Sequence, residues 1–171
     1  MGDIKKNRKK YSKPRHPWQK ERIEEEKKIL KEYGLKKKKE IWKLTSLLSR
    51  FKDRAKKLVA LKTKQAEKEK IDLLSRLSGF GLLEKNSRLE DVLSLTLKDI
   101  LERRLQTIVL RKKLAKTMNQ SRQFIIHGHI TVGEKKITAP SYLVLKKEEE
   151  LVNFTQKSSL FSMEHPERLK E

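Results

Sequence analysis

The side chains most able to do chemistry in this sequence are cations, and they are concentrated in residues 103–147. This stretch has 11 Lys and Arg side chains and a single carboxylate, Glu134, so ion pairs within it cannot neutralise its charge. Thr117 and Gln120 have the spacing of a capping box, which predicts the start of a short helix. A helix start offers free N–H groups and a partial positive charge, and Arg122 adds a full charge nearby. The pattern therefore predicts an anion-binding surface. Its polar members are Arg103, Arg104, Arg111, Lys112, Lys116, Thr117, Gln120, Ser121 and Arg122.

The same stretch lacks the groups that catalysis requires. General acid–base chemistry needs a positioned pair of carboxylates, or a histidine with an acid, and only one carboxylate is present. His127 and His129 could form a metal pair, but zinc takes three or four ligands and the chain has no cysteine. No glycine-rich phosphate loop of the GxGxxG or GxxxxGK[ST] type occurs. We therefore expect no enzyme, no cofactor and no metal site.

The charge of the whole chain indicates a polyanionic partner. The 171 residues include 44 Lys and Arg against 23 Asp and Glu, which gives a formal net charge of +21. The charge is +9 over residues 1–40, +7 over 41–78 and +10 over 103–147, whereas it is −2 over 79–102 and −3 over 148–171. Binding to phosphates releases counterions and would neutralise such blocks. No apolar run reaches the length of a membrane span and no secretion signal is recognisable, so we expect no membrane association.

Hydrophobic periodicity predicts a helical first half. Residues 1–16 have no apolar pattern and read as an extended basic arm that orders on a partner. A helix is expected from Pro17 to a stop at Gly34, followed by an apolar stripe with steps of three or four residues through 41–64. A third helix is expected over 66–77.

The second half changes its period. Thr96 with Asp99 predicts a helix start, and apolar spacing continues that helix to Val109. A short helix from Thr117 to about His127 follows. Alternating residues then predict three strands, which are expected at 129–132, 136–138 and 142–145. The expected domains are an arm at 1–16, a helical domain at 17–102, a module at 103–150 and an acidic tail at 151–171.

Two long motifs resemble a known family. The run LERRLQTIVLRKKLAK…NQSRQFIIHGHITVGEKKITAPSYLV is similar to the RNA-binding module named after the fourth protein of the small ribosomal subunit. Upstream, YSKPRHPWQKERIEEEKKILKEYGLKKKKEIWK resembles the archaeal and eukaryotic form of that ribosomal protein. The short, acidic end favours the archaeal form. The resemblance implies a mostly α fold with an α+β RNA-binding module: a helical N-terminal domain, and two helices packed on a small antiparallel sheet.

The resemblance also implies function and partners. It implies a primary binder of small-subunit rRNA that nucleates assembly of the five-prime domain and helps line the channel through which messenger RNA enters. Expected neighbours are other small-subunit proteins near that channel, with messenger RNA as a further candidate partner. The expected location is the small ribosomal subunit in the cytoplasm, without homo-oligomerisation. The rRNA-binding candidates carried over by position are Arg8, Lys9, Lys10, Tyr11, Lys13, Arg15, Lys36, Lys37, Lys38, Lys39, Arg103, Arg104, Arg111, Lys113, Lys116, Thr117, Gln120, Ser121, Arg122, His127, His129 and Lys136.

One alternative function remains open from the sequence, because the module could belong to an RNA-modifying or RNA-chaperone protein outside the ribosome.

The aromatic residues are candidates either for the core or for stacking on bases. Tyr33, Trp42 and Phe51 have the helical spacing of core residues, whereas Tyr11 and Trp18 lie in or next to the basic arm. The latter two are therefore the better candidates for stacking on bases.

Overall fold

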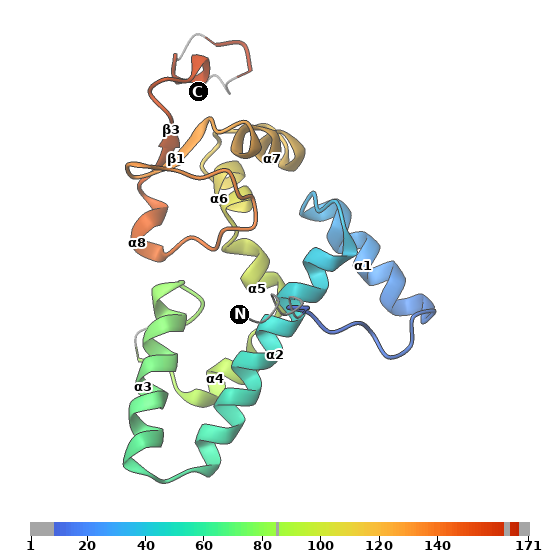
Figure 1. Cartoon of the computed structure of the whole chain (residues 1–171), viewed down its shortest axis with the longest axis vertical. Coiled ribbons are helices and arrows are strands. Elements are labelled where there is room, and N and C mark those ends of the chain that lie inside the picture. The colour runs from blue at the N-terminus through green and yellow to red at the C-terminus, as the bar shows by residue number, and fades with distance from the viewer. Residues whose placement is uncertain (1–8, 85, 163–164, 168–171) are drawn as a thin grey trace, which may run out of the picture.

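The computed structural model describes residues 9–84, 86–162 and 165–167 of the chain, and it divides them into a helical part and a smaller α+β module (Figure 1). The helical part contains α1 (Lys20–Glu32), α2 (Lys38–Ala60), α3 (Lys64–Gly79), α4 (Leu89–Ser94) and α5 (Leu97–Glu102). The module contains α6 (Leu105–Arg111), α7 (Met118–Ile126), β1 (Ile130–Val132), β2 (Lys135–Lys136), α8 (Lys146–Glu149), β3 (Val152–Phe154) and a short 3₁₀ helix, η1 (Ser159–Phe161). The predicted fold class, mostly helical with a small antiparallel sheet, is confirmed.

The long helix α2 is the central element of the helical part, because α1, α3, α4 and α5 all contact it. Its buried side chains follow the predicted three-to-four spacing, and α3 and α4 pack against it. Figure 1 shows α3 antiparallel to the C-terminal half of α2, while α1 lies near the N-terminal end of α2. The buried residues of α2 are Ile41, Leu44, Leu48, Phe51, Ala55 and Leu58. Tyr33 and Phe51 belong to this core and Trp42 packs partly buried against it, in agreement with their spacing.

The first helix ends as predicted but begins later. Gly34 follows α1 with a φ of +55°, a conformation that glycine adopts without the strain of a Cβ. The predicted start at Pro17 is wrong, because α1 begins at Lys20. The side chain of Arg22 donates hydrogen bonds to the carbonyl oxygens of His16 and Pro17, which hold that segment as a turn instead.

The single helix predicted from Thr96 to Val109 is divided. The capping box of Thr96 and Asp99 is present, but α5 ends at Glu102 and α6 begins at Leu105. Between them Arg104 is extended and forms an isolated antiparallel bridge with Leu143. Leu105 N donates to Tyr142 O at 2.8 Å, and Val144 N donates to Arg103 O at 3.0 Å. Long-range pairing therefore overrides the local helical pattern at this point.

The module places α6 and α7 against a three-stranded antiparallel sheet with the order β2-β1-β3. Thr117 caps α7, as predicted, by accepting a hydrogen bond from Gln120 N. The prediction of a strand at 142–145 is wrong, because the third strand is β3, in which Phe154 lies opposite Ile130 and Val152 opposite Val132. The residues of β3 fall within 151–171, the segment expected to form an acidic tail. Val152 and Phe154 are nevertheless buried in the core of the module.

The described part of the basic arm, residues 9–16, contains no helix or strand and lies along α2. Ser12 N donates to Ser46 Oγ at 3.0 Å, and the rings of Tyr11 and Trp42 lie with their centroids 6.0 Å apart. Within the protein itself, α2 therefore supplies both of these contacts to the arm. Among the described residues, no helix has the length and apolar content that crossing a membrane requires.

Candidate nucleic-acid interface

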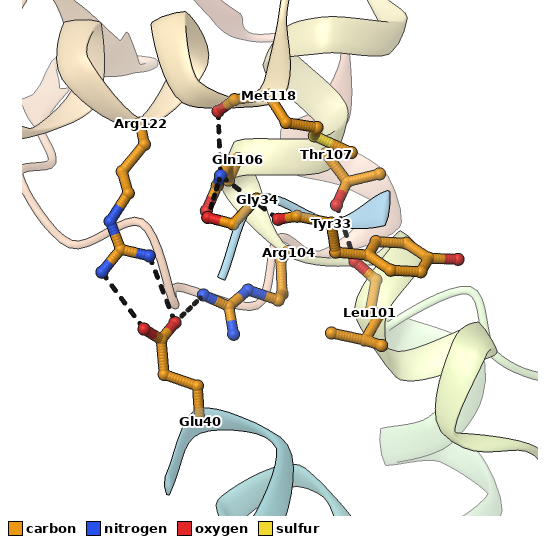
Figure 2. Close-up of polar contacts among 9 residues, drawn as sticks. All are labelled: Tyr33, Gly34, Glu40, Leu101, Arg104, Gln106, Thr107, Met118 and Arg122. Atoms are coloured by element: carbon orange, nitrogen blue, oxygen red, sulfur yellow. Dashed lines mark hydrogen bonds and ion pairs between the residues drawn. The ribbon is translucent and has the colours of Figure 1, made fainter. Parts of the chain in front are cut away.

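Glu40, in the first turn of α2, pairs with two arginines of the module across the boundary between the two parts (Figure 2). Arg104 Nη2 donates to Glu40 Oε2 at 2.8 Å, and the guanidinium of Arg122 bonds to both carboxylate oxygens at 3.2 and 3.3 Å. Burial alone raises the pKa of Glu40, but the hydrogen bonds from Arg122 and Arg104 outweigh it and hold that pKa below its ordinary value. The joint is therefore an ionised carboxylate between two cations.

A second contact lies beside this ion cluster. The Nε2 amide group of Gln106 in α6 donates to Met118 O at 2.9 Å and reaches the carbonyl oxygens of Tyr33 and Gly34 at 3.3 Å each (Figure 2). A Cβ atom at Gly34 would lie 2.9 Å from Met118 Cβ and 3.0 Å from Gln106 Nε2. The end of α1 therefore approaches the module as closely as a glycine permits. Together with Glu40, this contact fixes the orientation of the two parts.

Arg103 and Arg104 are engaged within the protein. The sequence presents both as surface cations, but the side chain of Arg104 is only 2% exposed and that of Arg103 only 13%. Arg103 Nη1 forms an ion pair with Glu149 at 2.7 Å, and its Nη2 donates to Val144 O at 3.2 Å. The expectation that both are exposed is wrong, because their partners Glu40 and Glu149 come from distant parts of the chain.

One group of exposed cations in the module lies between α6 and the start of α7. Lys113 is exposed and has a positive φ of 56°, and Lys116 is exposed with its Nζ 3.3 Å from Pro166 O. Lys112 Nζ instead donates to the carbonyl oxygens of residues 150 and 152. Arg111 is more than half exposed and pairs with Glu102. Of the other predicted residues here, Thr117 and Gln120 form the cap, whereas Ser121 is fully buried.

Predicted residues at the other end of α7 form a separate group. The rings of His127 and His129 stack with centroids 6.3 Å apart, and His129 Nδ1 lies 2.8 Å from Ser158 Oγ. Burial, followed by the charges of His127 and Lys136, lowers the pKa of His129, so it is neutral at physiological pH. The side chain of Lys136 lies over Gly128, where a Cβ would meet Lys136 Cε. In the described part of the chain, no three His, Cys, Asp or Glu residues gather as metal ligands would.

A groove opens at the boundary between the two parts, and we call it the joint groove. Its volume is about 390 Å³, and of the residues that the structure describes, five cations and one carboxylate line it together with apolar residues. The cations come from all three regions: Lys10 from the arm, Lys43 and Arg50 from α2, and Arg104 and Arg122 from the module. The remaining lining residues are Glu40, Leu44, Leu47, Pro140, Ser141 and Leu143.

The joint groove adds two residues of the charged face of α2 that are not among the predicted rRNA-binding candidates. Lys43 and Arg50 lie seven positions apart on α2, which places them on one face of the helix, and both are exposed. In the sequence, this seven-residue spacing of two cations is the signal that could identify them as part of one surface. The predicted cations Lys9, Lys13, Arg15, Lys36, Lys37 and Lys39 are also exposed, whereas Lys38 pairs with Glu26 at 3.3 Å. The candidate Arg8 lies outside the described residues.

Comparison with known proteins places these features in a family. The S4 domain family matches residues 103–150. Over nearly its whole length the chain resembles proteins named small ribosomal subunit protein uS4. That of Ignicoccus hospitalis is 49% identical over 94% of this chain and 97% of its own. That of Methanococcus aeolicus is 50% identical over 98% and 96%. That of Thermoplasma acidophilum is 49% identical over 98% and 86%.

These relatives confirm the resemblance drawn from the two sequence motifs, including its archaeal type. They are ribosomal proteins, a structural and non-enzymatic class, in agreement with the expectation that the chain is not an enzyme. The matches extend across the arm, the helical part and the module together. The chain therefore belongs to the uS4 family of small ribosomal subunit proteins.

Proposed function

We propose that this chain is a structural component of the small ribosomal subunit that binds small-subunit rRNA directly and helps to nucleate assembly. The binding is to the five-prime domain of that RNA, near other small-subunit proteins and the channel through which messenger RNA enters, in the cytoplasm. The family to which the chain belongs supports this role, and the near-complete coverage of ribosomal relatives favours it over an RNA-modifying protein outside the ribosome.

The observation that carries the proposal is the joint groove. Cations from the arm, α2 and the module face one volume of about 390 Å³, and Glu40 is the one carboxylate among its described lining residues. Glu40 is already paired with Arg104 and Arg122, which leaves Lys10, Lys43 and Arg50 without an acidic partner in that lining. Phosphate groups of RNA supply the missing negative charge.

Rigidity explains how such a surface selects folded RNA. The contacts of Glu40 and Gln106 hold the two parts in one orientation, so their exposed cations keep fixed distances. A fixed pattern of cations matches the spacing of phosphates around a particular RNA junction, because RNA helices are recognised by shape and backbone more than by base edges. We therefore propose recognition by shape, with few base-specific contacts.

The salt dependence of binding tests this function. The full chain is titrated with a five-prime-domain fragment of small-subunit rRNA at several salt concentrations. Each phosphate contact contributes about −0.7 to −0.9 to the slope of log K against log salt, so several contacts give a slope of several units. Replacing Lys43 and Arg50 together with Gln reduces the magnitude of the slope by about 1.4 to 1.8. Lys98→Gln, on an exposed residue away from the groove, leaves it unchanged. A wild-type slope near zero contradicts the proposal.

A further inference from the structure

The side chain of Trp18 stands out on the surface because it is 91% exposed. It lies in the turn between the arm and α1, which Figure 1 shows at the outer edge of the molecule. Large aromatic side chains are normally buried for most of their area, because that burial stabilises the fold. The other tryptophan, Trp42, is partly buried and packs against the core. The fold thus leaves the indole of Trp18 free for another contact.

The turn that presents Trp18 is held in place by Arg22. Its Nη2 donates to His16 O at 3.1 Å and to Pro17 O at 2.9 Å, the two carbonyl groups directly before Trp18. Its Nη1 forms an ion pair with Glu26 one turn further along α1. The backbone around Trp18 is therefore fixed to the helix.

Glu26 anchors this arrangement in the protein interior. It is only 6% exposed, accepts a hydrogen bond from Trp42 Nε1 at 3.0 Å and pairs with Lys38 at 3.3 Å. Burial alone raises the pKa of Glu26, but hydrogen bonds from Trp42, Arg22 and Lys38 outweigh it and lower that pKa. An ionised, buried carboxylate thus holds Arg22, and Arg22 holds the turn. Such preorganisation reduces the entropy lost when the indole binds a partner.

The charges around Trp18 indicate the chemistry of that partner. Between residues 9 and 20 there are five cations and no carboxylate, and all five cations are exposed. The first carboxylate on the helix side is Glu21, followed by Glu24 and Glu25, so four of the five cations lie on the arm side of the indole. A flat apolar face beside a run of cations suits an unpaired nucleobase, whose neighbouring phosphates are negative. The five cations are Lys9, Lys10, Lys13, Arg15 and Lys20.

We propose that Trp18 stacks on an unpaired base of small-subunit rRNA while cations of the arm contact the flanking phosphates. This inference rests on the proposed rRNA binding and adds a specific base contact to it. The other candidate for stacking, Tyr11, is engaged by Trp42, with 6.0 Å between their ring centroids. The structure thus assigns the stacking role to Trp18 alone of the two.

Substitutions at Trp18 in the full chain test the contact. Trp18→Leu keeps an apolar side chain but removes the aromatic face, and we expect about tenfold weaker binding to the five-prime-domain fragment. Trp18→Tyr keeps an aromatic face, and we expect less than about a threefold loss. Tryptophan fluorescence is quenched by RNA in the wild type and much less in Trp18→Tyr, which retains only Trp42. Ile71→Ala, at a 66% exposed apolar residue of α3, is the matched control and has no effect.

The outcomes separate the inference from the proposed function. Wild-type affinity in Trp18→Leu, with salt-dependent binding intact, overturns the stacking role and leaves the rRNA-binding function in place. A defect seen only in assembled subunits, with binding to the free RNA fragment unchanged, means that Trp18 contacts a protein and also overturns it. A wild-type chain that shows no salt-dependent binding overturns the function, and the stacking role with it.

Discussion

Arg104 Nη2 donates a hydrogen bond to Glu40 Oε2 across 2.8 Å, although the two residues are 64 positions apart in the chain. Glu40 lies in the first turn of α2, whereas Arg104 is the N-cap residue of α6, the first helix of the module. Burial lowers the pKa of Arg104, and the carboxylate of Glu40 opposes that shift. Each of the two residues therefore depends on the other, because the charge of one stabilises the ionised form of its partner against the cost of burial.

Removing the carboxylate at the joint is expected to destabilise the protein. Glu40→Gln keeps the size of the side chain but leaves Arg104 and Arg122 without their counter-charge. We expect the free energy of unfolding to fall by about 2 kcal/mol, below the range for fully buried pairs because Glu40 is 19% exposed. Denaturant unfolding measures this change. Glu32→Gln, at a 52% exposed residue paired with Lys98 at 3.9 Å, is the control and should change stability by less than about 0.5 kcal/mol.

The same carboxylates predict a loss of stability in acid. The pKa values of Glu40 and Glu26 are lowered from the ordinary value of 4.5, so the folded state binds these protons less readily than the unfolded state. Their stabilising contribution is complete above the unfolded pKa and is lost as the pH falls through the folded pKa. Urea unfolding between about pH 6 and about pH 3 should therefore show a decline that is shallower in Glu40→Gln. Equal declines in the two proteins would refute this assignment.

Gly34 is expected to tolerate no larger side chain. Its φ of +55° disfavours a Cβ, and the nearest atoms, Met118 Cβ and Gln106 Nε2, would lie within 3.0 Å of it. We expect Gly34→Ala to lower the free energy of unfolding by about 2 kcal/mol. Gly79→Ala is the matched control, because the closest atom to its added Cβ is 4.0 Å away. That substitution should be neutral or stabilise by about 0.5 kcal/mol.

Substitution should distinguish cations that stabilise the fold from cations that bind RNA, because the first kind lowers stability and the second lowers RNA affinity. Arg104→Ala removes a buried partner of Glu40 and is expected to cost about 3 kcal/mol of stability. Lys113→Gln changes an exposed residue and should leave stability within about 0.5 kcal/mol. We expect it instead to weaken rRNA binding and reduce the salt slope by about 0.9. Measuring unfolding and RNA affinity for both proteins decides the matter, and the reverse pattern would count against the assignment.

Local signals predicted the fold well wherever local packing decides the structure. The apolar spacing of α2, the stop at Gly34 and the cap at Thr117 all depend on residues within a few positions of one another. The break after Glu102 could not be predicted in this way, because its cause is pairing with Tyr142 and Val144. The third strand was missed although Val152 and Phe154 alternate with the exposed Asn153, because the preceding acidic run resembled a solvated tail.

The site shows the same division. Sequence identifies a cation but not its partner, so Arg104 and Arg122 were predicted to face RNA while their carboxylate lies 64 and 82 positions away. Conversely, Lys43 and Arg50 lie on the exposed face of α2, and only the module on the other side makes them part of a groove. A cationic surface made of two parts of a chain becomes visible only when the fold brings those parts together.

The central claim is that rRNA occupies the joint groove, and photo-crosslinking from Ser141 tests it most directly. Ser141 lines the groove, is exposed and carries no charge, so a photoreactive residue there leaves the cations intact. In assembled small subunits, the account predicts crosslinks from position 141 to rRNA. Normal assembly with crosslinks only to protein, or with none, would contradict it.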